Sequence, residues 1–201
     1  SMMELYYIPA ACSLAAHIAS LEAGLPINCR MVEMNPAGNT VDGGDYTKIN
    51  PLGLVPTIVD GDTMISEAAV VLQYIADKAD GKLGDVSSSG RWKMLETLNF
   101  LATEVHKSMG PLFRPDLPAE ARPLFEKLIA SRLTAAENRI GSSGYLVGNS
   151  FTVADAYFFT LLGWCNFLKM DMSPWPKLGE YLQRIGSRPA VQQALKEEGL
   201  A

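Results

Sequence analysis

The chain has 201 residues, which is enough for one large domain or two small ones. Hydrophobic residues make up 48% and charged residues 19% of it, a composition typical of globular proteins and not of disordered ones. The formal net charge of -5 lacks the basic excess that nucleic-acid binding normally requires, so we expect no nucleic-acid partner.

The chain also lacks the sequence signals of membrane insertion and export. Its longest apolar stretch is shorter than the roughly 20 residues of a spanning helix, and no basic-then-apolar leader precedes the first predicted strand. Cys12, Cys29 and Cys165 are too scattered for a disulfide framework or a zinc site, so we expect no metal. A reducing cytoplasm is the predicted location.

The N-terminal residues alternate between strand and helix patterns. Residues 3–8 form a β-branched and aromatic run, a strand signal. Residues 13–23 place apolar side chains at helical spacing before Gly24, and residues 26–34 return to a strand pattern. This order predicts a βαβ unit with two parallel strands.

The next segment predicts a loop, a hairpin and a helix. Residues 35–44 are rich in Asn, Pro and Gly and are a predicted loop. Residues 55–59 and 63–65 are predicted strands, joined by an Asp-Gly-Asp turn. Residues 67–79 carry an apolar helical face.

Only helical periods follow a segment rich in glycine and serine. The predicted helices cover residues 91–113, 118–140, 152–168, 175–185 and 189–197. We therefore predict an α/β domain of residues 1–80, a linker of residues 81–87 and an all-helical domain of residues 88–201.

Cys12 lies in the turn between the first predicted strand and helix. Backbone N–H groups and the helix dipole at such a position favour an anion, so we expect the Cys12 thiol to ionise readily. Two interpretations stay open: a reactive thiol, or a small packed residue, as most lone cysteines are. No second cysteine stands at CxxC spacing, so a reacting partner thiol would come from a small molecule.

Two other positions suit a peptide-like ligand. A cis bond between Val55 and Pro56 would expose the Val55 backbone to an extended ligand, although a trans proline at a strand start is commoner. Glu67 opens a predicted helix, where a carboxylate either complements the helix dipole or receives a ligand ammonium. Taken alone, dipole complementation is the better interpretation of Glu67.

A polar stripe runs along the first helix of the second domain. Asn99, Thr103 and His106 are spaced four and three residues apart and so share one helical face. Together they predict a hydrogen-bonding wall that lines a cleft between the two domains, where ligand sites often form. For His17, in the first predicted helix, we expect a structural role.

Short motifs stand in a fixed order along nearly the whole chain. They include Leu5-Tyr6-Tyr7, Cys12-Ser13-Leu14, Ile49-Asn50-Pro51, Val55-Pro56, Gln73-Tyr74-Ile75-Ala76-Asp77, Glu104-Val105-His106-Lys107 and Phe151-Thr152-Val153-Ala154-Asp155. Each motif alone is weak, but the ordered set resembles the cytosolic glutathione transferases, most closely the bacterial beta class. The resemblance implies a thioredoxin-like N-terminal domain (βαβαββα), an all-α C-terminal domain and a cytoplasmic homodimer that binds glutathione at the domain cleft.

The resemblance also implies site roles in the N-terminal domain. Cys12 would lie beside the glutathione sulfur and be able to form a mixed disulfide with it. Val55, before cis-Pro56, would pair with the cysteinyl backbone of glutathione. Glu67 would accept the γ-glutamyl ammonium, and the N–H of Ala68 would bind its carboxylate.

In the helical domain, the resemblance implies a second set of glutathione-binding residues. They are Asn99, Thr103, Glu104, His106 and Lys107. Cys12 and His106 would have catalytic roles, the first as nucleophile or thiolate partner and the second as hydrogen-bond donor. Ala68 lacks a hydroxyl, and residues 35–40 lack a lysine for the glycyl carboxylate, a loss of roughly ten- to a hundredfold in glutathione affinity.

We therefore expect a detoxifying transferase that directs the glutathione thiolate at small hydrophobic electrophiles, with glutathione as co-substrate. One alternative on the same scaffold is a glutathione-dependent thiol–disulfide reductase or peroxidase that uses Cys12. Another is a non-catalytic carrier of apolar ligands, suggested by the nine methionines and by the aromatic residues of the second domain.

Overall fold

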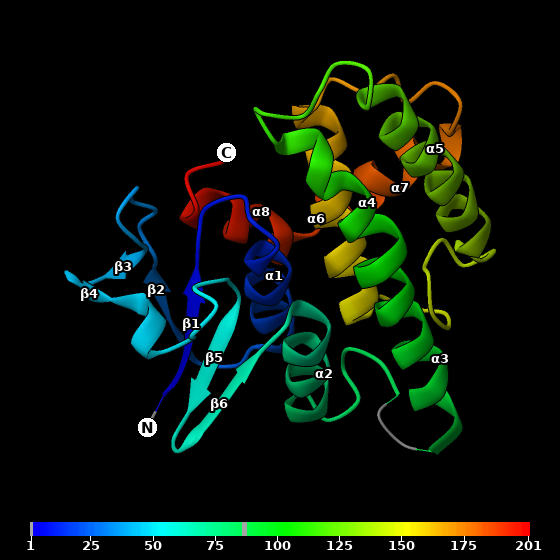
Figure 1. The fold of residues 1–201 in the computed structure, drawn as a ribbon. Helices are drawn as coiled ribbons and strands as arrows, with labels where there is room; N and C mark the ends of the chain where they lie inside the picture. The colour runs from blue at the N-terminus through cyan, green and yellow to red at the C-terminus, as the bar shows by residue number, and fades with distance from the viewer. Residues whose placement is uncertain (1, 86–87) are drawn as a thin grey trace.

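The computed structural model describes residues 2–85 and 88–201. Figure 1 shows a β-sheet with its helices on one side of the molecule and a group of longer helices on the other. This is the α/β arrangement followed by an all-helical part that the sequence predicts. Part of the predicted linker, at residues 86–87, lies outside the described residues.

The first three elements form the predicted βαβ unit. Strands β1 (Met3–Tyr7) and β2 (Ile27–Met31) pair in parallel, and α1 (Ser13–Ala23) connects them. The helix ends at Gly24, whose φ of 66° lies in the left-handed region that glycine adopts without steric cost.

A hairpin and a helix complete the sheet. Strands β5 (Thr57–Asp60) and β6 (Thr63–Ser66) are antiparallel, with Asp60 opposite Thr63, so the predicted hairpin is confirmed. The sheet order is β2-β1-β5-β6, and β1 is antiparallel to β5. Helix α2 (Ala68–Lys78) follows and packs beside α1 on one face of the sheet (Figure 1).

The segment predicted as a loop contains a small ribbon. Strands β3 (Thr40–Val41) and β4 (Gly44–Asp45) pair across Asp42 and Gly43, which have φ values of 51° and 79°. Positive φ at both central residues is the two-residue hairpin geometry that an Asp-Gly pair favours. The second helix of the expected βαβαββα order is here only the one-turn 3-10 helix η1 (Tyr46–Lys48).

The long helix predicted over residues 91–113 is divided into four segments. These are α3 (Ser88–Phe100), the π-helical turn η2 (Leu101–His106), α4 (Lys107–Met109) and the 3-10 helix η3 (Gly110–Phe113). Pro111 lacks the N–H that a continuing α-helix would need, which accounts for the tightened end. The wide π turn leaves no signal in a 3.6-residue pattern, so sequence periodicity does not detect it.

The remaining helices are close to their predicted positions. They are α5 (Arg122–Arg139), α6 (Val153–Phe167), α7 (Pro176–Gly186) and α8 (Pro189–Glu197). Helix α5 begins at Arg122 and not at Pro118 as predicted. At the start of α6, Thr152 and Asp155 form a capping box.

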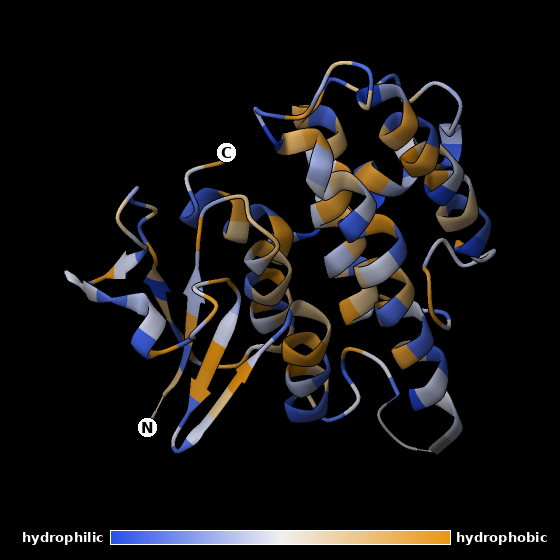
Figure 2. Ribbon diagram, in the orientation of Figure 1, coloured by the Kyte–Doolittle hydropathy of each residue, from blue (hydrophilic) through white to orange (hydrophobic). Residues whose placement is uncertain are grey.

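The main core joins the two parts of the molecule. Residues 13–20 of α1 are all buried, because α1 packs against the sheet and α2 on one side and against α6 and α8 on the other (Figure 1). Figure 2 shows the corresponding hydrophobic colouring along α1, α2 and α6. Across residues 2–85 and 88–201, no helix combines the length and the apolar character that crossing a membrane requires.

Candidate functional site

The turn between β1 and α1 is held in place by its own hydrogen bonds. Ser13 Oγ donates to the Ile8 carbonyl at 3.3 Å and accepts from the Ile8 N–H at 3.2 Å. The Ala11 N–H donates to the Ile8 carbonyl at 3.1 Å. Ala10 has φ = 66°, a left-handed conformation that costs a residue with a Cβ about 1–2 kcal/mol. The turn ends at Cys12, the residue that precedes the first turn of α1.

The Cys12 thiol and the Val55 backbone meet in this turn. Cys12 Sγ donates to the Val55 carbonyl oxygen at 3.1 Å. The Val55–Pro56 peptide bond is cis, as the family resemblance implied. Pro56 is buried and Val55 is half-buried, so part of Val55 stays accessible to solvent beside the thiol.

The surroundings of the Cys12 thiol oppose the ready ionisation that its position at the start of a helix predicts. Burial raises the pKa of Cys12 to about 11, and the negative charge of Glu67 adds to that effect. Hydrogen bonds from the Cys12 and Ser13 N–H groups, together with the charge of Lys107, lower the pKa but do not outweigh burial. Only the protonated thiol can donate to the Val55 carbonyl, so the hydrogen bond and the raised pKa agree.

Glu67 stands at the start of α2, where the sequence placed it. Its backbone has φ = 72°, and Ala68 is the first residue of the helix, where N–H groups have no partner within the helix. The charge of Glu67 raises the pKa of Cys12 and also that of Tyr157 in α6. An exposed carboxylate and the N-terminus of a helix therefore lie within electrostatic range of the thiol.

His106 ends the π turn and faces α6. Its Nδ1 lies 2.6 Å from Tyr157 Oη, and its ring makes an edge contact with Trp164 at a centroid distance of 4.9 Å. Burial and the charge of Lys107 lower the pKa of His106 to about 4, while burial raises the pKa of Tyr157 far above its usual range. Tyr157 therefore donates to Nδ1, which leaves the proton of a neutral His106 on Nε2.

The polar stripe does not form one continuous wall. Asn99 is exposed and lines a groove against α2, and Thr103 Oγ1 donates to the Asn99 carbonyl at 3.0 Å. Glu104 is paired with Arg132 of α5 at 2.9 Å, while His106 contacts α6. The π turn between Leu101 and His106 changes the angular spacing that a regular helix would give these residues.

Lys107 completes the group around the thiol from the helical part. It is exposed, and its charge lowers the pKa of both Cys12 and His106. The structure therefore brings Cys12, Val55, Glu67, His106 and Lys107 into one region between the sheet and the helices. Within the described residues, no group of three or more His, Cys, Asp or Glu side chains could hold a metal ion.

Three neighbours of this region were not assigned a site role from the sequence. Tyr157 fixes the tautomer of His106, and Trp164 Nε1 donates to the Ala10 carbonyl at 2.8 Å. Glu198 accepts from the Ala10 N–H at 3.1 Å. All three come from segments far from Cys12 in the sequence, and no local spacing signal connects them to it.

The fold combines a thioredoxin-like sheet, with a thiol and a cis-proline beside it, and a helical part that contributes a histidine and a lysine. This combination defines the class of protein. The family model "Glutathione S-transferase, N-terminal domain" matches residues 11–78, and "Glutathione S-transferase, C-terminal domain" matches residues 101–189. The chain belongs to the glutathione S-transferase family.

Individual relatives agree with this assignment over the full length. Glutathione S-transferase GstA of Escherichia coli O157:H7 is 37% identical and aligns with 98% of this chain and 100% of its own. A sphingomonad glutathione S-transferase complexed with glutathione has a TM-score of 0.91 and 36% identity, covering 98% of this chain and 100% of its own. The bacterial beta class glutathione S-transferase of Sphingomonas chungbukensis has a TM-score of 0.91, 35% identity and the same coverage.

Proposed function

We propose that the chain binds glutathione beside Cys12 and catalyses the attack of its thiolate on electrophilic carbon. In this reaction a sulfur–carbon bond forms, the bond from carbon to the leaving group breaks, and the thiol proton passes to solvent. The observation that carries the proposal is the meeting of Cys12, the Val55 backbone and Glu67 with His106 and Lys107, in a chain of this family.

The roles in binding follow from the chemistry of each group. The main chain of Val55 pairs with the cysteinyl backbone of glutathione, and buried Pro56 fixes its direction. Glu67 receives the γ-glutamyl ammonium, while the N–H of Ala68, which has no partner within α2, binds the neighbouring carboxylate. The contact of Glu104 is secondary to these, because Glu104 is already paired with Arg132. Asn99 and Thr103 are exposed and would add further polar contacts.

The thiolate of glutathione is stabilised by groups that already act on the Cys12 sulfur. The N–H groups of Cys12 and Ser13 and the charge of Lys107 each lower the pKa of the Cys12 thiol. The same groups lower the pKa of a glutathione thiol placed beside it, and the Nε2–H of His106 adds a hydrogen-bond donor. Cys12 itself keeps its proton and donates a hydrogen bond.

The protonated state of Cys12 favours conjugation over the thiol–disulfide alternative. A reductase or peroxidase cycle needs Cys12 as the attacking thiolate, and a pKa of about 11 leaves little thiolate at neutral pH. The test compares glutathione-dependent turnover of a chromogenic aryl halide with that of hydroxyethyl disulfide. Faster turnover of the aryl halide supports the proposal. Faster disulfide reduction, or no heat of glutathione binding in calorimetry, contradicts it.

We further propose that the chain is a homodimer in the cytoplasm, joined through an open groove between α2 and α3. The groove has a volume of about 650 Å³ and is lined mainly by apolar side chains, of which Val70 is 52% and Trp92 70% exposed. At its base, the buried amide nitrogen and oxygen of Gln73 have no hydrogen-bond partner within the described residues. A second copy would cover the exposed apolar side chains of the groove.

A further inference from the structure

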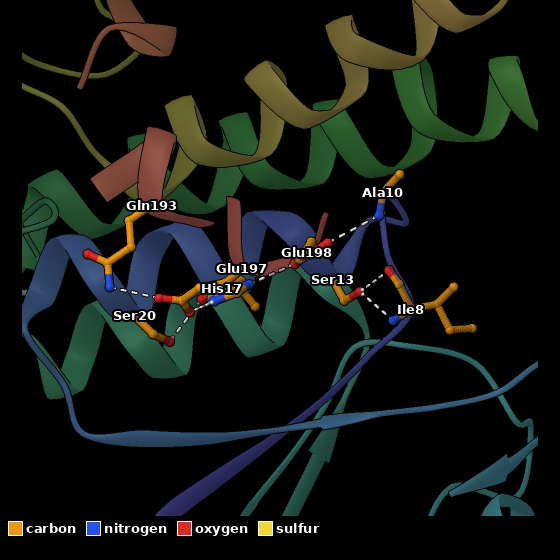
Figure 3. A network of polar contacts seen from close by, with 9 residues as sticks. Ile8, Ala10, Ser13, His17, Ser20, Gln193, Glu197 and Glu198 are labelled. Carbon is orange, nitrogen blue, oxygen red and sulfur yellow. Dashed lines mark hydrogen bonds and ion pairs between the residues drawn. The ribbon is translucent and has the colours of Figure 1, made fainter. Parts of the chain in front are cut away.

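Glu198 connects the end of the chain to the turn that carries Cys12. It follows α8, and its side chain is fully buried. Its two oxygens have different partners, as Figure 3 shows: Oε1 accepts from the Ala10 N–H at 3.1 Å, and Oε2 lies 2.7 Å from His17 Nδ1. One carboxylate therefore joins the C-terminal segment to both the turn and α1.

The Ala10 peptide is held from both sides by the helical part of the molecule. Glu198 binds its N–H, and Trp164 of α6 donates to its carbonyl oxygen at 2.8 Å. Ala10 stands two residues before Cys12 and has the unfavourable φ of 66°, which persists only where the surroundings hold it. The position of the thiol therefore depends on contacts made outside its own domain.

His17 supplies the charge that a buried carboxylate needs. Burial opposes the charged imidazole, but the neighbouring Cys29 and the hydrogen-bonded carboxylates of Glu198 and Glu197 outweigh it and raise the pKa of His17 to about 10. The cation on His17 therefore pairs with Glu198 without competing for the oxygen that binds Ala10.

Glu197 provides a natural control for Glu198. It lies 2.8 Å from the other ring nitrogen of His17, at nearly the same distance as Glu198. Its side chain is 43% exposed, and its further partner is Gln193 and not the turn (Figure 3). The two neighbouring carboxylates thus share the contact with His17 and differ in the contact with Ala10.

We propose that Glu198 is a positioning residue, which fixes the Ala10 peptide and through it the place of the Cys12 thiol. Its effect on turnover rests on the proposed glutathione chemistry, but its effect on Cys12 does not. Removing the Glu198 carboxylate frees the Ala10 N–H and lets the turn relax. The Cys12 sulfur then loses its hydrogen bond with Val55 and becomes more accessible.

The experiment compares Glu198→Ala, Glu198→Gln and Glu197→Ala by iodoacetamide alkylation of Cys12 without glutathione, followed by mass spectrometry. Glu198→Ala is expected to raise the alkylation rate roughly tenfold, the effect of losing one charge-assisted hydrogen bond. Glu198→Gln keeps an acceptor for the Ala10 N–H and is expected to stay within about threefold of the native protein. Glu197→Ala is expected to lower the urea midpoint of unfolding with little change in alkylation.

Turnover gives a second readout on the same variants. Glu198→Ala is expected to raise the KM for glutathione more than it lowers kcat, while Glu197→Ala changes neither beyond about twofold. Equal alkylation rates in Glu198→Ala and Glu197→Ala would overturn the proposal. Absent turnover in the native protein contradicts the proposed function alone, because alkylation still tests Glu198.

A measurement on the native protein covers the case in which Glu198→Ala does not fold. The Ala10 amide lies in a turn outside any helix or strand, so its protection from hydrogen exchange reports the Glu198 contact directly. We expect protection at least tenfold greater than that of the amides of the exposed residues Asn35 and Ala37. An unprotected Ala10 amide contradicts the proposal.

Discussion

Cys12 and His106 illustrate what a sequence can and cannot say about a single residue. Their types and positions were sufficient to predict a thiol at a helix N-terminus and a histidine near a domain boundary. Their protonation states were not predictable, because burial outweighs the favourable N–H groups at Cys12 and lowers the pKa of His106. Desolvation depends on packing by residues distant in the sequence.

The pH dependence of Cys12 alkylation follows from its raised pKa. With a thiol pKa of about 11, the thiolate fraction increases about tenfold for each pH unit between 7 and 10, and the alkylation rate follows it. The measurement is the rate of iodoacetamide incorporation at Cys12, with Cys12→Ser as the control for Cys29 and Cys165. A rate that reaches a plateau near pH 7 would contradict the prediction.

His106 is expected to act as a neutral donor throughout the physiological range. Because its pKa is lowered to about 4, it gains a proton only in strong acid, and its titration adds no inflection to the activity between pH 5 and 8. We expect His106→Ala to lower kcat/KM for conjugation about tenfold and His106→Gln, which keeps an N–H donor, to lose less. Similar losses in both variants would argue against the hydrogen bond.

At the scale of elements, the predictable parts are those coded by adjacent residues. The βαβ unit, the Asp60–Thr63 hairpin and the capping box at Thr152 all depend on local patterns, and the structure contains each of them. The Asp42-Gly43 turn had the same kind of signal but lay within a segment interpreted as a loop. The π turn had no local signal.

The contact between α1 and α8 makes stability depend on pH through His17. Its folded pKa is raised to about 10, above the ordinary 6.5, so the stabilising charge is fully present below about pH 6.5 and lost as pH rises through 10. The groups that face the ring are Glu197, Glu198, Cys29 and Tyr7.

We expect the unfolding free energy of the native protein to fall between pH 7 and 10 relative to that of His17→Gln. Urea unfolding of both proteins at several pH values measures the difference. Parallel curves over this interval would show that His17 is not charged in the folded state.

At the scale of the whole molecule, the ordered motifs were enough to predict the fold and the family. The links between the two parts were not predictable, because Glu198 and Ala10 are 188 residues apart and Trp164 and Ala10 are 154 apart. The partners of the polar stripe of Asn99, Thr103 and His106 were not predictable for the same reason. Which side chains meet across a domain boundary is decided by tertiary packing.

The proposed dimer predicts a change in molecular mass. Trp92→Glu places a charge in the apolar groove between α2 and α3, and we expect it to convert the dimer into a monomer in light scattering. Leu124→Glu, at a 71% exposed position on α5, is the control and should leave the mass unchanged. A native protein that is already monomeric contradicts the proposal.

The hydrogen bond from the Trp164 indole to the Ala10 carbonyl gives the protein a built-in optical reporter. The chain has three tryptophans: Trp164 touches the Cys12 turn, Trp92 lines the groove on α3, and Trp175 is 7% exposed. A Trp92→Phe, Trp175→Phe protein would emit from Trp164 alone. Its fluorescence would follow ligand arrival at the turn in real time, with no label attached.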